Sequence, residues 1–457
     1  MSFSPIIAAT RFGTGLSPHI APPTSVASML ALLTGPDTAA IRVPITGFWR
    51  AEPKLVDLRN LRRAEVAARN TAGHQASREA VRDAVLIGRQ SQLDDYMAML
   101  TRGATTSDGL RERLAAFWAD HFTVRAKNQF TRHLVGPYVE SAIRPVMTGS
   151  FETLLKTAVL HPMMIDYLDQ SRSIGPQSYV AQNSGGGLNE NLARELMELH
   201  TLGVDGPYAQ ADVRELAELL TGLFWNPDRL LEYLPRRAEP GAETVLGQTF
   251  SAQPEMEAVE AALSALAAHP ATGWHICTKL AVHFVSDTPA PALIVAMVAR
   301  WNETKGNLLA VYEAMLTHPD AWHDTPEKVK PPVAYIMSSL RALGLGSELA
   351  ALDPALQTRH LLSPLRVMGQ AWERPTGPDG WPEAAQAWIT PQFLAGRINW
   401  AMIVPHHLMT PLPDPRAFVY DALGPMPPDD TVFAARAAGT RAVGIGVVLA
   451  SSAFQRR

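Results

Sequence analysis

Side chains that can transfer protons or bind a metal are concentrated in one short run, residues 185–200 (GGGLNENLARELMELH). Three glycines lead directly into a segment that carries Asn, Glu, Arg and His. Carboxylate and imidazole groups are the usual general acids, general bases and metal ligands of enzymes. Glycines ahead of them let the backbone approach a ligand closely. The run is therefore a candidate active site, and the competing interpretation is a solvated surface helix.

The polar residues of this run share one face if residues 189–202 form a helix. At 100° per residue, one arc holds the side chains that could perform chemistry. They are Glu190, Asn191, Arg194, Glu195 and Glu198. His200 falls on the opposite, apolar arc, so it does not point the same way as the glutamates. A metal site built from this helix alone is geometrically awkward, and any chemistry needs partners from elsewhere in the chain.

The spacing of these residues supports two hypotheses. Glu190 stands four residues before Arg194, and Arg194 four before Glu198, which is the spacing of ion pairs along an exposed helix. In the first hypothesis the protein is an enzyme for hydrolysis or group transfer, with a carboxylate as general base or metal ligand and Arg194 holding an anionic substrate. In the alternative it is a non-catalytic helical binding or assembly protein, in which the same residues form a structural ion-pair network.

His121 is the first partner to consider for the enzyme hypothesis. It lies in the segment FWADHF, residues 117–122, at the end of an apolar helix. A histidine among aromatic residues is more often a hydrogen-bonded core residue than a ligand. A contact with Glu195, Glu198 or His200 would instead create an acid–base pair or a site for a divalent metal. His121 and His200 are thus the candidate metal ligands, and the cofactor is otherwise unknown.

Cationic residues outside the run are candidates for binding an anionic group, provided that the fold brings them together. They are Lys279, Lys330 and Arg397. The stretch 59–89 is also rich in arginine, but mixed charges on amphipathic helices are typical of a solvated surface. The chain contains no GxSxG, GK[ST]-type phosphate loop, HExxH or paired CxxC motif, so its substrate and reaction stay open.

The elements that position these groups are predicted to be helical. Hydrophobic residues make up 47% of the chain and charged residues 18%, which suits a large core and excludes a disordered chain. Helical periodicity dominates, so the expected fold is all-α, a large multi-helix body. One short strand or hairpin is expected near residues 243–250.

Helices are predicted over many segments of this body, and the apolar residues 443–450 predict a buried terminal helix. The other predicted ranges are 26–33, 58–69, 76–101, 109–122, 130–148, 150–160, 189–202, 211–222, 255–268, 274–285, 290–303, 307–317 and 331–343. The length of 457 residues suits a single large helical domain over residues 1–457, or two tightly packed subdomains with a seam near 224–254.

Charge and hydropathy limit the partners and the compartment. The net charge of −4 provides no overall attraction to nucleic acid, so no nucleic-acid partner is expected. No stretch is long enough to be a transmembrane segment, which needs roughly 20 apolar residues. The N-terminus lacks the basic start and apolar stretch of a secretory signal, so the chain is expected to be cytoplasmic. A protein partner and a small-molecule substrate both stay open.

Several motifs, spread over most of the chain, are similar to those of one protein family. They are NENLARELMELHTLGVDG at 189–206, RFGTG at 11–15, FWADHF at 117–122, HP at 161–162 with YLD at 167–169, KL at 279–280, KVKP at 328–331, PDGWP at 378–382, and Arg397. Together they resemble the bacterial domain of unknown function 1800 family. The resemblance implies a mainly helical protein without an assigned activity. It also implies export for many members, in contrast to the cytoplasmic expectation, and genes often encoded beside those of a second, poorly characterised family.

Overall fold

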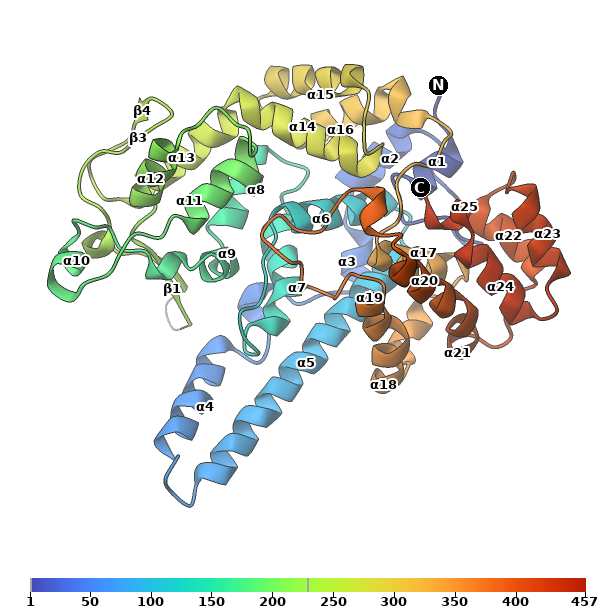
Figure 1. Cartoon of the computed structure of the whole chain (residues 1–457), viewed down its shortest axis with the longest axis horizontal. Coiled ribbons are helices and arrows are strands. Elements are labelled where there is room, and N and C mark those ends of the chain that lie inside the picture. The colour runs from blue at the N-terminus through green and yellow to red at the C-terminus, as the bar shows by residue number, and fades with distance from the viewer. Residues whose placement is uncertain (1, 228–229) are drawn as a thin grey trace.

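The computed structural model describes residues 2–227 and 230–457, and helices dominate it, as Figure 1 shows. The predicted all-α class is confirmed. Both sheets of the described residues are short antiparallel hairpins: β1 (Leu223–Asn226) with β2 (Leu230–Tyr233), and β3 (Thr244–Val245) with β4 (Gln248–Thr249). The second hairpin confirms the one predicted near residues 243–250, whereas the first was not predicted.

The helices before the first hairpin include the predicted central segment. They are α1 (Pro5–Thr10), α2 (Val26–Thr34), α3 (Thr38–Arg42), η1 (Phe48–Arg50), α4 (Leu55–Ala67), α5 (His74–Thr105), α6 (Gly109–His121), η2 (Arg132–Leu134), α7 (Val135–Tyr138), η3 (Val139–Ile143), α8 (Phe151–Val159), α9 (Pro162–Tyr167), η4 (Gln170–Arg172), α10 (Tyr179–Ser184), α11 (Asn191–Glu195), η5 (Leu196–Thr201) and α12 (Gln210–Leu219). Among these elements, η3 and η5 are π-helices, and η1, η2 and η4 are 3₁₀-helices.

The helices after the first hairpin extend to the end of the chain. They are η6 (Pro235–Arg237), α13 (Met256–Ala268), α14 (Pro270–Phe284), α15 (Pro291–Thr304), α16 (Leu308–Thr317), η7 (Pro319–Trp322), α17 (Pro332–Ala342), η8 (Ser347–Ala351), α18 (Pro354–Gln357), η9 (Thr358–Leu362), α19 (Ser363–Val367), η10 (Ala385–Ala387), α20 (Pro391–Ile403), α21 (Pro405–Leu408), α22 (Pro415–Leu423), α23 (Asp429–Ala437), α24 (Arg441–Ala450) and α25 (Ser452–Gln455). The terminal helix predicted at 443–450 is confirmed as α24. Within the described residues, no helix combines the length and the apolar character needed to cross a membrane.

Two predicted helices are wrong in part. The range 130–148 is divided into η2, α7 and the π-helix η3. Pro137 lies in the first turn of α7, where proline is tolerated because the N–H groups of a first turn have no partner within the helix. The range therefore stays helical up to Ile143 but changes from 3₁₀- to α- to π-helix. The range 189–202 begins as the α-helix α11 but ends as the π-helix η5.

The apolar interior is divided into two cores. The first is built from residues between Ala8 and Trp322, including the inward face of α11 and η5. The second combines α17 and the later helices with the C-terminal half of α5, which contributes Leu93, Tyr96 and Leu100. A single domain, or two subdomains with a seam near 224–254, stays a prediction.

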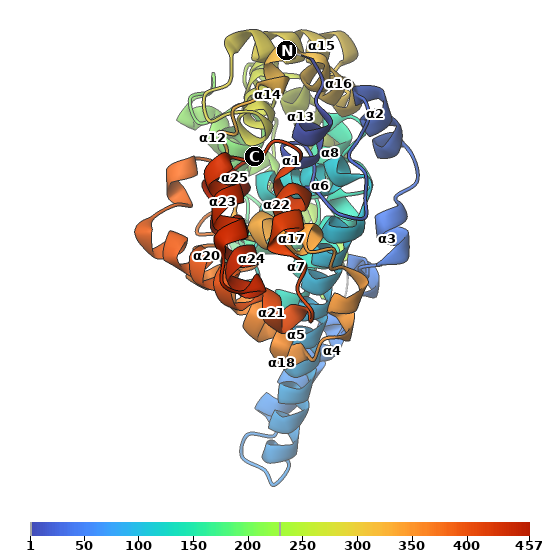
Figure 2. The ribbon, with the colours of Figure 1, turned by 90° about the vertical axis from the view of Figure 1, so that its right-hand side faces the viewer.

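The helices α4 and α5 form an antiparallel hairpin whose tip projects from the body (Figures 1 and 2). We call residues 55–90 the arm. The 32 residues of α5 span about 48 Å at 1.5 Å per residue, so this one helix runs from the tip of the arm into the second core. Gly103 allows α17 to pack directly against α5, because a Cβ at this position would lie 2.1 Å from the sulfur of Met337.

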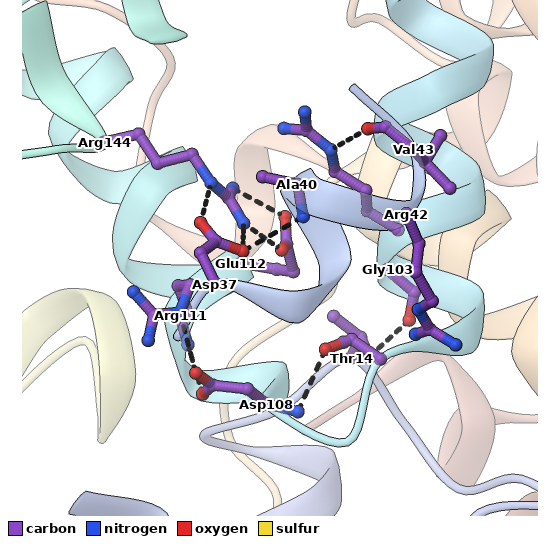
Figure 3. A network of polar contacts seen from close by, with 12 residues as sticks. Thr14, Asp37, Ala40, Arg42, Val43, Gly103, Asp108, Arg111, Glu112 and Arg144 are labelled. Carbon is purple, nitrogen blue, oxygen red and sulfur yellow. Dashed lines mark hydrogen bonds and ion pairs between the residues drawn. The ribbon is translucent and has the colours of Figure 1, made fainter. Parts of the chain in front are cut away.

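A buried ion cluster joins the N-terminal segment to α6 and η3. Figure 3 shows Arg144 between Asp37, the N-cap of α3, and Glu112 on α6. Its guanidinium donates to both oxygens of Asp37 (2.6 and 3.0 Å) and to both oxygens of Glu112 (3.0 and 2.6 Å). Burial lowers the pKa of Arg144, but the hydrogen bonds and charges of the two carboxylates outweigh burial and raise it. The cation is therefore permanently charged and pairs with two acids at once.

Replacement of Arg144 by Met should destabilise the protein by about 3 kcal/mol, because two largely buried carboxylates lose their cation. Urea denaturation at pH 7, followed by far-UV circular dichroism, measures this change. Arg78→Met, on an exposed part of α5, is the control and should change stability by less than about 0.5 kcal/mol. Equal effects of the two substitutions would show that the cluster does not stabilise the fold.

Candidate functional site

Asn189 fixes the start of the central helix. Its side-chain N–H group donates to the carbonyls of Leu168 and Asp169 (3.2 and 3.3 Å), and its Oδ1 accepts the backbone N–H of Asn191 (3.0 Å). The helix is therefore tied at its first turn to the segment that follows α9. The side chain of Asn191 itself is exposed and forms no hydrogen bond to the part of the chain that the structure describes.

Glu190, Arg194 and Glu198 form the predicted ion-pair ladder on the outer face of this helix. Arg194 lies 3.0 Å from Glu190 and 3.2 Å from Glu198. Gln210, at the start of α12, closes the network by accepting from Arg194 and donating to Glu190, both at 2.9 Å. The three charged side chains are 25 to 38% exposed. They satisfy one another and are arranged as the structural alternative requires.

Two histidines from other helices cap the C-terminal end of the π-helix η5. His121, the last residue of α6, donates from Nε2 to the carbonyl of His200 (3.3 Å), and His275, on α14, donates from Nε2 to the carbonyl of Leu199 (3.0 Å). Carbonyls only accept hydrogen bonds, so both Nε2 atoms carry a proton. Gly203, with a φ of 91°, then ends the segment in the left-handed region that favours glycine. Carbonyls that a helix end leaves unpaired are thus bound by side chains.

His121 and His200 are buried beside each other, with ring centroids 5.8 Å apart. His200 faces the core, as predicted from the helical wheel. Burial lowers the pKa of both rings, to about 3 for His200, so both are neutral at pH 7. Across residues 2–227 and 230–457, no group of three or more His, Cys, Asp or Glu side chains is placed to hold a metal ion. A metal at His121 and His200 therefore stays a prediction.

Lys279, on α14, lies beside these histidines. It is half-buried, and no described residue forms a hydrogen bond or an ion pair with its ammonium group. Burial lowers the pKa of Lys279, against the charges of Asp120 and Glu383. Burial also lowers the pKa of His121 and His275, and the charge of Lys279 lowers both further. We refer to the following interacting groups as the Lys279 cluster: Asp120, Glu195, Lys279, Asp379 and Glu383.

Asp120 anchors the loop that contains PDGWP. The backbone N–H of Trp381 donates to both carboxylate oxygens of Asp120, at 3.0 and 3.2 Å. Gly380 allows this approach: its φ is 79°, and a Cβ would lie 2.7 Å from Oδ1 of Asp120. Burial is the main cause that raises the pKa of Asp120 to about 7. This carboxyl group therefore titrates near neutral pH.

Glu195 is the glutamate of the predicted set whose charge interacts with the PDGWP loop. It is half-buried, and burial followed by the charges of Glu198 and Asp379 raises its pKa. Glu195 and Asp379 also contribute to the raised pKa of Tyr167, after burial. Neither Glu195 nor Glu198 forms a hydrogen bond with His121 among the described residues. The predicted pocket is thus divided, with Glu195 in the Lys279 cluster and its neighbours in the ladder.

Glu383 holds the same loop from its other side. His283 donates from Nδ1 to Glu383, and Lys328 lies 3.2 Å from the second carboxylate oxygen. Arg113 donates to Nε2 of His283 at 3.0 Å, and since arginine only donates, the ring is the neutral tautomer with its proton on Nδ1. Burial raises the pKa of Glu383, but His283 and Lys328 outweigh burial and lower it to about 2.

Lys330 and Arg397 interact with each other rather than with Lys279. Arg397 is fully buried and donates to Gln455 (2.9 Å), while Nε and one terminal nitrogen have no hydrogen-bond partner in the described part of the chain. Lys330 lies 4.0 Å from the ring centroid of Phe454. Burial, followed by the charge of Arg397, lowers the pKa of Lys330 to about 7. Of the three cations predicted to bind an anionic group, Lys330 and Arg397 thus lie together, and Lys279 lies elsewhere.

Comparison with protein families gives one match. The family described as "Protein of unknown function (DUF1800)" matches residues 9–456, nearly the whole chain. The chain belongs to this family. Comparison with curated proteins and with solved structures gave no match.

The motifs that carry the DUF1800 resemblance supply four of the five residues of the Lys279 cluster, and the fifth, Glu383, directly follows PDGWP. Asp120 comes from FWADHF, Glu195 from NENLARELMELH, Lys279 from the segment KL, and Asp379 from PDGWP. Asp120, Asp379 and Glu383 are not among the residues predicted from the sequence. Their places in the motifs could have pointed to two of them, since Asp120 precedes His121 in FWADHF and Asp379 lies in PDGWP. Segments far apart in the chain thus form one polar cluster in this DUF1800 member.

Replacement of Asp120 by Asn should change stability in a pH-dependent way. The folded-state pKa of about 7 lies above the ordinary value of 3.8. Ionisation of this carboxyl group therefore lowers the stability of the wild-type protein as pH rises from about 4 to 7. Asn does not ionise. Its stability relative to wild type should therefore increase over this range, by on the order of 2 kcal/mol, and level off above pH 7. Urea denaturation at pH 4.5, 6 and 8 measures this, with exposed Asp57→Asn as control. A pH-independent difference would contradict the burial of Asp120.

Replacement of Glu383 by Gln should show the opposite trend. Its pKa is lowered from 4.5 to about 2, so its stabilising effect is complete above about pH 4.5 and is lost as pH falls through 2. We expect a loss of about 2 kcal/mol at pH 7, because 32% of the side chain is exposed and solvent screens the pair. Thermal unfolding at pH 7, 4 and 2.5 should show the difference narrowing towards acid. Exposed Glu303→Gln is the control, and a constant difference would exclude the proposed pairing.

Proposed function

We propose that this protein is an enzyme that uses the Lys279 cluster for general acid–base catalysis of hydrolysis or group transfer. One observation carries the proposal, the electrostatic interaction between Lys279 and Asp120. The ammonium group of Lys279 is half-buried and has no hydrogen-bond partner in the described chain, and Asp120 is a carboxyl group whose pKa is raised to about 7. Perturbed titratable groups in one place are typical of catalytic sites.

Three groups of the cluster have a chemical task in this proposal. Acid–base catalysis is most effective when the pKa of the catalytic group lies near the working pH, which suits Asp120 as the proton-transfer residue. Lys279 has open N–H donors that can stabilise negative charge developing on a substrate oxygen. Glu195, whose pKa is also raised, supplies a second carboxyl group. Arg194 has no task in this scheme, because its guanidinium pairs with Glu190 and Glu198.

His121 is a positioning residue in this scheme. It is neutral and buried, and it donates to the end of the helix that carries Glu195. His275 does the same from α14, one helical turn before Lys279. The two caps therefore link the helix of Glu195 to the helices of Asp120 and Lys279, which supports a defined geometry between the three groups.

A second candidate function is the non-catalytic binding or assembly protein. The completed ladder of Glu190, Arg194, Glu198 and Gln210 supports it, because every charged group of the ladder has a partner. The two functions differ in what Lys279 should do. A lysine that stabilises charge on a substrate must be reachable from solvent, whereas a structural lysine need not be.

Chemical labelling of the purified full chain tests this difference without a known substrate. With an amine-selective acylating reagent at pH 7, Lys279 should react at least about tenfold faster than exposed Lys305, since its lowered pKa supplies more free amine. Peptide mass spectrometry gives both rates.

In a panel of chromogenic esters, phosphomonoesters and glycosides, turnover should fall by about 100-fold or more in Lys279→Met and Asp120→Asn. Arg194→Ala is the matched control and should retain turnover and lose less than about 1 kcal/mol of stability.

Labelling of Lys279 at or below the rate of Lys305 would exclude the enzyme proposal, because no substrate could then use this amine. Equal turnover in wild type and Lys279→Met would exclude it as well. Loss of turnover in Arg194→Ala with no loss in Asp120→Asn would move the reaction from the Lys279 cluster to the ladder.

A further inference from the structure

A cleft separates the arm from the body. Its volume is about 420 Å³, within the range of roughly 300–1,000 Å³ that small-molecule sites occupy. One wall is α4, which contributes Arg59, Arg62 and Arg63, and the facing wall includes Asp166 and Trp225. We call this space the arm cleft. None of its lining residues belongs to the Lys279 cluster.

The α4 wall of the arm cleft is cationic. Arg59, Arg62 and Arg63 follow one another at the spacing of one helix face. Arg62 pairs with Glu65 on the same helix. Arg63 is exposed and forms no hydrogen bond or ion pair with the described residues. A guanidinium with its donors available favours a carboxylate or a phosphate, whose oxygens match its planar geometry.

The facing wall contains buried polar atoms that lack a protein partner. These atoms are Oδ2 of Asp166, Oγ1 of Thr131 and Nε1 of Trp225, each without a hydrogen bond to the described residues. Buried polar atoms are nearly always paired in folded proteins, so three exceptions in residues that line one cleft require an explanation. These atoms have almost no accessible surface, so a ligand reaches the carboxyl group of Asp166 and the hydroxyl group of Thr131 once their side chains rotate towards the cleft. Trp225 and Phe130 add flat apolar surface to the same cleft.

We propose that the arm cleft binds an anionic sugar, a hydroxylated ring that carries one carboxylate or phosphate group. The hydroxyls complete the hydrogen bonding of Asp166 and Thr131, and the ring packs on the aromatic surface. Arg63 binds the anionic group. A plain anion would leave the facing wall unpaired, and an uncharged sugar would leave Arg63 without a partner.

Calorimetric titration of the full chain with four probes tests this proposal: glucuronate, glucose 6-phosphate, glucose and inorganic phosphate. At least one anionic sugar should bind with a Kd below about 1 mM, and glucose and phosphate should bind about tenfold more weakly or not at all. The preferred anionic sugar identifies the charged group as a carboxylate or a phosphate. Arg63→Ala should weaken binding about tenfold, because it removes the anion contact.

The matched control is Arg69→Ala, which removes an exposed arginine outside the cleft and should leave the Kd within about twofold. Lys279→Met should also leave it unchanged, so this test and the test of the catalytic proposal fail independently. The proposal is overturned if neither anionic sugar saturates below about 10 mM, or if phosphate alone binds as tightly as the sugars. Unchanged affinity in Arg63→Ala would equally exclude the arm cleft as the site.

Discussion

Glu383 lies between His283 and Lys328, and this pairing holds the PDGWP loop against the ends of α6 and α14. The loop is attached a second time where the N–H of Trp381 meets the carboxylate of Asp120. Burial of Asp120 and Lys279 is the first cause of both pKa shifts, so the shifts depend on the loop that excludes water from them. The chemistry proposed for the cluster therefore depends on an ion pair that does not itself react.

The central helix serves two different purposes along its two faces. Its outer face carries the ladder of Glu190, Arg194 and Glu198, which is closed by Gln210 and exposed to water. Its inner end widens into a π-helix, and such turns are frequent at functional sites because they displace backbone groups from their regular partners. Here the carbonyls at its C-terminal end are bound by histidines, which brings α6 and α14 to the same helix end.

Properties that depend on local sequence could be predicted, and those that depend on distant contacts could not. Helical periodicity sufficed for the all-α class, and turn residues for the hairpin near 243–250. The helical wheel placed His200 in the core correctly, although His200 lies in the π-helix η5 and not in a regular α-helix. The contact between Asp120 and Trp381 joins residues 261 positions apart, so no local pattern contains it. The helix predicted over 130–148 was wrong in its type, because apolar periodicity does not distinguish the successive 3₁₀-, α- and π-helical turns found there.

The length of α5 has a mechanical consequence. The helix is continuous from His74 to Thr105, and Leu93, Tyr96 and Leu100 fix its C-terminal half in the second core. Bending at the base of the arm would require this packed segment to move with it, so the arm is held rigidly relative to the second core. Because α4 packs along α5, the width of the arm cleft is set before any ligand binds. A ligand then meets two walls that already stand at their final distance, and the ordering of the protein is confined to side chains of the facing wall.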